Sequence, residues 1–159
     1  MNMENREKPI GIFDSGLGGL TSVKAVSEAL PNEDIVYFGD TARVPYGDRS
    51  KETIMEYVKD DIEFLLSHDV KAIVIACNTA DSMARLEMES IFRIPIVGVV
   101  GPAAKKAALA TENGRIGVIG TNATVRSDAY RKVINEYNPS ASVFAVACPL
   151  LVPLVEEGR

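Results

Sequence analysis

The strongest constraint on the fold is a regular alternation between short apolar runs and longer segments of helical periodicity. Unbroken apolar runs of this kind are typical of strands covered on both faces, as in a parallel sheet. Strands are predicted at 9–13, 34–38, 73–75, 96–100, 114–120 and 142–147. Helices are predicted at 20–30, 51–67, 80–89, 103–111 and around 130–137. The alternation predicts an α/β fold, with a doubly wound parallel sheet flanked by helices.

One strand leads directly into a cysteine. The run Ile73–Ile75 stops at Cys77, and Asn78 and Thr79 follow, either of which is expected to cap the next helix. Cys77 is therefore expected at the carboxyl end of a buried strand, where ligands bind in open α/β sheets. A helix N-terminus at this position is also expected to lower the thiol pKa. A buried structural cysteine is the alternative interpretation.

A glycine-rich segment, DSGLGGL at 14–20, follows the first predicted strand and precedes a helix. This order is typical of a cradle for phosphate or carboxylate. The segment is not a dinucleotide fingerprint, because Thr21 stands where the third glycine belongs, and the chain has no Gly-Lys-Ser/Thr for a Walker motif. Asp14 lies at the mouth of the cradle, either as a functional acid or as a turn residue that binds nearby N–H groups.

A long loop, Gly39–Ser50, is predicted at the same end of the sheet. Long loops at that edge tend to be functional. Tyr46 and Gly47 offer an aromatic wall and backbone donors. Arg43 and Arg49 either meet a carboxylate or are solvated surface charges.

Charge and composition argue against several classes of function. The formal net charge of −5 argues against nonspecific nucleic-acid binding, although backbone donors can still bind a small anion. No apolar run approaches the ~20 residues that span a bilayer, and Met1–Lys8 has no signal-peptide core, so no membrane partner and a cytoplasmic location are expected. Cys77, Cys148 and His68 lack paired-ligand spacing, and we expect no metal.

The candidate residues favour proton transfer over covalent thiol catalysis. An acid, a cysteine and several hydroxyl, amide and backbone donors are predicted to converge on one cleft. A thiol nucleophile normally needs a histidine base, and His68, the single histidine, is expected away from that cleft. A thiolate that deprotonates a carbon alpha to a carboxylate needs no histidine.

Five segments resemble bacterial glutamate racemases, the cofactor-independent branch of the aspartate/glutamate racemase superfamily, and the first three do so closely. They are GIFDSGLGGL at 11–20, YFGDTARVPYG at 37–47, ACNTA at 76–80, GTNAT at 120–124 and CPLLVPLVEEG at 148–158. The resemblance implies two α/β domains with the active site between them, expected here as a first domain at 1–99 and an incomplete second domain at 100–159. It also implies interconversion of L- and D-glutamate, without a cofactor, for peptidoglycan synthesis.

The resemblance also implies roles for individual residues. Cys77 resembles one of two cysteines that exchange the Cα proton from opposite faces. Asp14 resembles the acid that assists this cysteine and meets the substrate ammonium, and Glu156 resembles an auxiliary acid. Substrate contacts are expected from Asp14, Ser15, Tyr46, Gly47, Asn78, Thr79, Thr121 and Thr124.

The chain departs from the family in one respect. The family's second cysteine lies in a Cys-Thr-His segment that is absent here, and Cys148 matches a Cys-Pro segment instead. The chain is therefore expected to be impaired or inactive alone, and to self-associate through exposed apolar surface, a homodimer included. The alternatives are a racemase for aspartate or another amino acid, and a non-catalytic anion-binding or interaction module.

Overall fold

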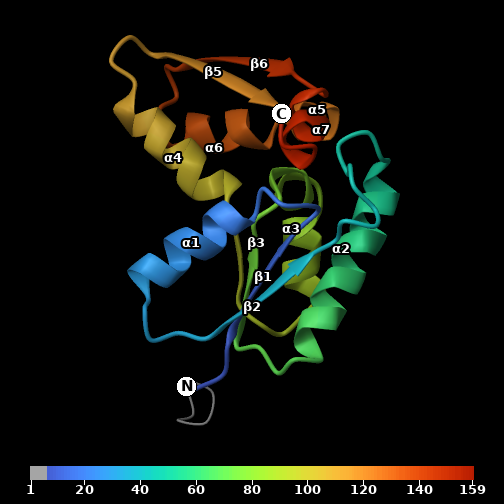
Figure 1. Ribbon diagram of the computed structural model, residues 1–159. Coiled ribbons are helices and arrows are strands. Elements are labelled where there is room, and N and C mark those ends of the chain that lie inside the picture. The colour runs from blue at the N-terminus through green and yellow to red at the C-terminus, as the bar shows by residue number, and fades with distance from the viewer. Residues whose placement is uncertain (1–6) are drawn as a thin grey trace.

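The computed structural model describes residues 7–159 as two parallel sheets with helices packed against them (Figure 1). The predicted α/β class is confirmed. In chain order the elements are β1 (Ile10–Asp14), α1 (Leu20–Ala29), β2 (Ile35–Gly39), α2 (Lys51–Leu66), β3 (Ala72–Ile75), α3 (Asn78–Ile91), β4 (Ile96–Gly98), α4 (Val100–Ala110), β5 (Arg115–Gly120), α5 (Asn122–Ser127), α6 (Ala129–Tyr137), β6 (Ser142–Ala147) and α7 (Leu151–Glu156). The prediction about a signal peptide falls largely on residues 1–6, which lie outside the described residues.

The first sheet has the strand order β2-β1-β3-β4, and every pairing is parallel. Phe13 of β1 pairs with Phe38 of β2 and with Ile75 of β3, so the carboxyl ends of these strands are level. In Figure 1, α1 lies on one side of this sheet, and α2 and α3 lie on the other. The level strand ends bring the segments that follow β1, β2 and β3 to one edge.

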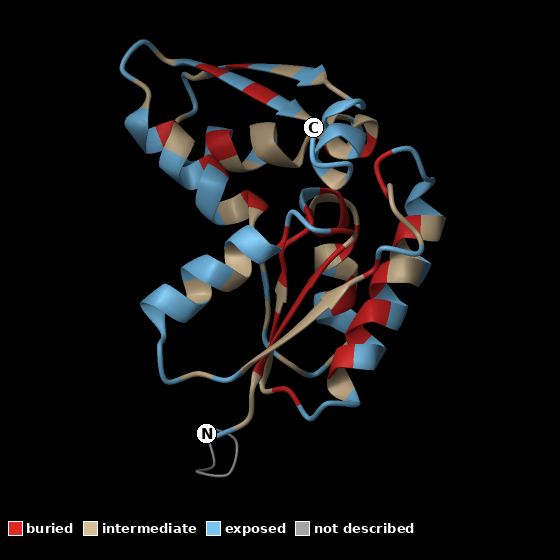
Figure 2. Ribbon diagram, viewed as in Figure 1, coloured by how far each residue is buried: buried red, intermediate tan, exposed pale blue. Residues whose placement is uncertain are grey.

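The main core lies between this sheet and α2 and α3 (Figure 2). Helix α2 buries Ile54, Val58 and Ile62 at helical spacing. Each fully buried side chain of this size contributes about 1.5–3 kcal/mol relative to the exposed state. By contrast, α1 has no fully buried residue, and Val23 and Val26 are only partly covered where they pack on the sheet. The sheet is therefore anchored mainly from the α2–α3 side.

The second sheet consists of β5 and β6 in parallel pairing, and a second core joins this sheet to α4 and α6. Ile116 and Val143 face these helices and are buried. On the opposite face, Ile119, Phe144 and Val146 are each more than half exposed. A parallel sheet is normally covered on both faces, so this apolar face is unusual.

Several boundaries differ from the sequence prediction. Helix α4 begins at Val100, so Pro102 is its third residue and not its first as predicted. The buried carboxylate of Asp81 accepts a 2.6 Å hydrogen bond from the Val100 amide, and this contact from α3 ends β4 early. The short helices α5 and α7 were not predicted. Within residues 7–159, no helix has the length and apolar character needed to cross a membrane.

Candidate functional site

A cavity of about 440 Å³ lies at the carboxyl edge of the first sheet, where it meets α5 and α7. Its lining includes every predicted site residue except Thr124, namely Asp14, Ser15, Tyr46, Gly47, Cys77, Asn78, Thr79, Thr121 and Glu156. Thr124 lines a neighbouring cavity of about 230 Å³, together with Cys148. The structure therefore brings the predicted residues together, and the roles assigned to them remain predictions.

Asp14 is the last residue of β1, and its side chain folds back onto the glycine-rich turn. Its Oδ2 atom accepts hydrogen bonds from the Gly16 amide at 3.1 Å and from the Gly19 amide at 3.0 Å. Gly19 must lack a side chain, because a Cβ atom there would lie 2.5 Å from the Asp14 Cβ. Asp14 is thus a turn residue that also presents a buried carboxylate to the cavity.

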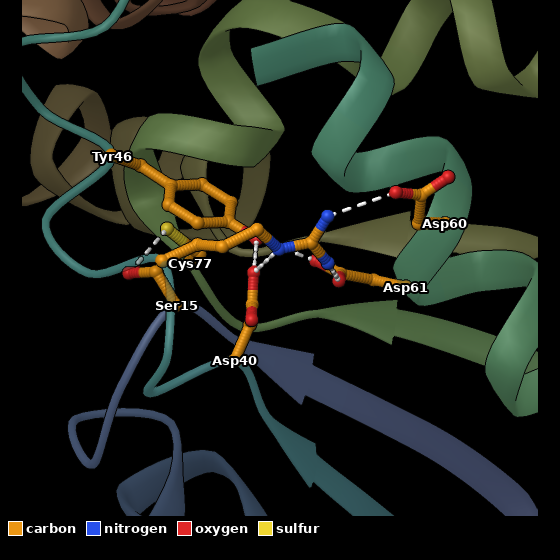
Figure 3. Close-up of polar contacts among 7 residues, drawn as sticks. Ser15, Asp40, Tyr46, Asp60, Asp61 and Cys77 are labelled. Atoms are coloured by element: carbon orange, nitrogen blue, oxygen red, sulfur yellow. Dashed lines mark hydrogen bonds and ion pairs between the residues drawn. The ribbon is translucent and has the colours of Figure 1, made fainter. Parts of the chain in front are cut away.

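Cys77 lies two residues beyond β3 and is almost fully buried. Its thiol donates to the Ser15 hydroxyl, with Sγ and Oγ 3.4 Å apart (Figure 3), and its sulfur accepts from the Ala80 amide at 3.5 Å. The sulfur is therefore the N-cap of α3. The prediction that Asn78 or Thr79 caps this helix is wrong, because both residues already lie within the first turn of α3.

The predicted lowering of the thiol pKa is also wrong. The pKa of Cys77 is raised to about 11, mainly by burial and secondarily by the nearby carboxylate of Asp14. The contacts with Ser15 and Ala80 favour the thiolate but do not offset these two effects. The Cys77 thiol consequently keeps its proton at neutral pH. A positive charge beside Asp14 would weaken the like-charge repulsion and lower this pKa, although burial would persist.

Tyr46 forms one wall of the cavity and contacts two carboxyl groups behind it (Figure 3). Its hydroxyl lies 2.9 Å from Asp61 Oδ2 and also contacts Asp40 Oδ2. Burial and the hydrogen bond with Asp40 raise the pKa of Tyr46, and burial raises the pKa of Asp61 to about 7. Arg43 forms ion pairs with both Asp40 and Asp61. Of the two roles left open for it, Arg43 therefore meets carboxylates, but they belong to the protein itself, and Arg43 does not line the cavity.

Three threonine hydroxyl groups contact one another where the start of α3 meets the start of α5. Thr79 Oγ1 and Thr121 Oγ1 lie 2.9 Å apart, and Thr124 Oγ1 lies within hydrogen-bond distance of both. Thr121 also caps α5 through the Thr124 amide. The exposed Asn78 accepts a 2.6 Å hydrogen bond from the Tyr130 hydroxyl. These groups offer donors and acceptors to a small polar ligand.

Glu156 ends α7 and rests on the glycine-rich turn. Its Oε1 atom accepts from the Leu17 amide at 2.9 Å, which links α7, a part of the cavity lining, to the glycine-rich turn. This contact leaves its predicted role as an auxiliary acid untested. His68 lies beyond α2, where Nδ1 is 3.0 Å from the Phe64 carbonyl oxygen, away from the cavity lining.

Sequence reasoning missed two carboxylates that support the site. Asp40 follows β2, and its amide donates to the Asp14 carbonyl oxygen at 2.9 Å. Asp61 lies on the buried face of α2, between Val58 and Ile62. An acid on the apolar stripe of an amphipathic helix was the available signal. In the described part of the chain, no group of three or more His, Cys, Asp and Glu side chains is arranged to hold a metal ion.

Comparison with known proteins places these features in a family. The model of the Asp/Glu/Hydantoin racemase family matches residues 20–157. The glutamate racemase of Geobacter metallireducens is 54% identical over 151 residues, which cover 95% of this chain and 56% of that protein. The glutamate racemase of Neisseria gonorrhoeae is 54% identical over 159 residues, covering 98% of this chain and 59% of that protein.

Solved structures agree with the sequence comparison. Glutamate racemase RacE1 from Bacillus anthracis matches with a TM-score of 0.90 and 41% identity, over 93% of this chain and 56% of that one. The Francisella tularensis glutamate racemase, solved with D-glutamate, matches with a TM-score of 0.85 and 44% identity, over 96% and 57%. The chain thus spans somewhat more than half the length of these relatives. With its motifs, its fold and this similarity in agreement, the chain belongs to the Asp/Glu/hydantoin racemase family.

Proposed function

We propose that this chain carries one acid–base face of a glutamate racemase site. The observation that supports it most directly is the buried Cys77 thiol, held between the Ser15 hydroxyl and the Ala80 amide in a cavity that Asp14 also lines. The glutamate racemases among its relatives make glutamate the first substrate to test. No cofactor enters the proposal, because a thiol and a carboxylate suffice for transfer of the Cα proton.

The proposed chemistry begins with the charge on Asp14. The substrate ammonium pairs with this carboxylate, which lowers the pKa of Cys77 from its raised value. The Cys77 thiol loses its proton to solvent, and the resulting thiolate takes the Cα proton and becomes a thiol again. The electron pair of the broken C–H bond moves onto the substrate carboxylate. Backbone N–H groups at the start of α3 and the hydroxyls of Thr79 and Thr121 stabilise the added negative charge.

Inversion requires a second acid that protonates the opposite face of Cα. Cys148 is a poor candidate, since it lines the neighbouring cavity with Thr124 and Tyr130 and not the cavity of Cys77. We therefore propose that these 159 residues exchange the Cα proton but racemise glutamate slowly or not at all.

The proposal also covers the use of the product, the domain boundary and self-association of the chain. We propose that D-glutamate formed at a site of this kind serves peptidoglycan synthesis in the cytoplasm. We propose a domain boundary at residues 99–100, near the junction of β4 and α4. The uncovered apolar face of the second sheet supports self-association of the isolated chain, with a homodimer as its simplest form.

Proton NMR in D₂O tests this function. L- and D-glutamate are incubated separately with the chain, with Cys77→Ala as the control and aspartate as the competing substrate. Loss of the Cα proton signal from one enantiomer, abolished by the substitution, is the expected result. Rapid interconversion of both enantiomers would show that the second acid lies within this chain. Absence of both exchange and glutamate binding would refute the proposal for this chain.

A further inference from the structure

Helix α2 buries a carboxyl group on its apolar face. Asp61 lies in line with Val58, Ile62 and Leu65 and is 0% exposed. A carboxyl group at such a position destabilises the fold unless it is well paired. Because an apolar side chain would pack there at no such cost, the acid calls for a reason beyond stability.

The partners of Asp61 lie in the loop that forms the cavity wall (Figure 3). Its Oδ1 atom accepts from Arg43 Nη2 at 2.8 Å, and its Oδ2 atom accepts from the Tyr46 hydroxyl at 2.9 Å. Arg43 in turn binds Asp40 through Nε at 2.5 Å and lies 4.5 Å from the centroid of the Tyr57 ring. Of this cluster, only Tyr46 reaches the cavity lining.

The residues after Tyr46 contact α5, the short helix that follows β5. The Gly47 carbonyl oxygen accepts from the Ala123 amide at 2.9 Å, and Asp48 Oδ1 accepts from Asn122 Nδ2 at 2.7 Å. A Cβ atom on Gly47 would lie 2.6 Å from the Thr121 Cβ. The loop therefore spans the cavity from the buried carboxyl group on α2 to the start of α5.

We propose that Asp61 is a positioning residue for the ligand of this cavity. By contacting Tyr46 and Arg43 at once, as Asp40 also does, it helps to fix the 45–47 wall and, through Gly47, the separation between that wall and α5. The two oxygens of a carboxyl group orient both partners, which no apolar side chain of similar volume can do. The identity of the ligand, glutamate, rests on the proposed function, whereas the positioning of the wall does not.

Neighbouring acids provide a matched pair of variants, Asp61→Asn and Asp60→Asn. Asp60 also pairs with Arg43, at 2.8 Å, but its side chain is 61% exposed, and the Tyr46 hydroxyl bonds to Asp40 and Asp61 instead. Two properties are measured: hydrogen exchange of the Ala123 amide, and the affinity for glutamate by NMR titration. Asp61→Asn is expected to speed the exchange and to weaken glutamate binding roughly tenfold, the scale of a hydrogen bond to a charged group. Asp60→Asn is expected to change neither, since exposed ion pairs contribute little.

A double-mutant cycle with Tyr46→Phe separates positioning from general stability. If Asp61 acts through Tyr46, Asp61→Asn will have little further effect on affinity or on Ala123 exchange in the Tyr46→Phe background. Additive effects, or an Ala123 amide unchanged by Tyr46→Phe, would overturn the proposal. If Asp61→Asn fails to fold, an Ala123 amide unchanged by Tyr46→Phe still overturns the proposal. If the wild type binds no glutamate, the proposed function fails, and the Ala123 exchange rates still decide the role of Asp61.

Discussion

Replacing Asp14 with asparagine is expected to lower the pKa of the Cys77 thiol and to speed its alkylation at a fixed pH. After burial, the Asp14 carboxylate is the largest effect that raises this pKa to about 11. Asparagine removes the charge, while its carbonyl oxygen can still accept from the Gly16 and Gly19 amides that Asp14 binds. The turn is therefore kept, and the electrostatic effect is isolated.

The size of the effect follows from the thiolate population. With a pKa of about 11, roughly one Cys77 in a thousand is ionised at pH 8, compared with about a quarter of unperturbed cysteines. Each unit by which the pKa falls raises that population about tenfold. Burial persists in Asp14→Asn, so we expect alkylation at pH 8 to rise roughly tenfold and the pKa to stay above that of an exposed thiol.

Iodoacetamide labelling across a pH series, read by peptide mass spectrometry, measures this directly. Cys148 is only partly buried and reports reagent quality in the same sample. Restricted access slows labelling of Cys77 at every pH but does not move the midpoint of the pH profile. A wild-type midpoint near pH 8, or a midpoint that Asp14→Asn leaves in place, would refute the electrostatic reasoning.

Two further predictions concern stability. Gly19→Ala is expected to cost about 1–3 kcal/mol in urea unfolding, because its Cβ would lie 2.5 Å from that of Asp14. Gly16→Ala should cost clearly less, since its Cβ meets only the movable end of Glu156, and equal losses would contradict this account. The pKa of Asp61 is raised from 3.8 to about 7, so the folded state binds its proton more tightly than the unfolded state. The unfolding free energy of the wild type, relative to that of Asp61→Asn, should therefore fall by on the order of 4 kcal/mol as the pH rises from about 4 to about 7. A difference in unfolding free energy that does not change with pH would contradict the burial effect.

Local pattern predicted much of the fold. Strand β6 lies where its apolar run indicates, and the strands of the first sheet begin and end within a few residues of their predicted positions. Helix α4 was placed less well, because Asp81, distant in sequence, binds the Val100 amide and starts the helix within an apparent strand. The short helices α5 and α7 carry too few residues for a periodic signal.

The candidate site was predicted as a set of residues but not as an electrostatic environment. The alternation of apolar runs places the polar residues after β1, β2 and β3 at one edge, because parallel strands share a direction. Sequence therefore sufficed to group Asp14, Tyr46 and Cys77. It assigned the wrong direction to the pKa of Cys77, since the helix-terminus argument does not include the depth of burial or the distance to Asp14.

The sequence by itself determined the α/β class and the edge of the sheet at which the site lies, because both follow from the local order of apolar and polar residues. Only the tertiary structure decided that Cys77 keeps its proton and that the buried Asp61 holds Tyr46 against the cavity. It also decided that one face of the second sheet is left uncovered. The physical reason is that desolvation and Coulomb interactions depend on distances between segments far apart in the chain, and no local pattern encodes those distances.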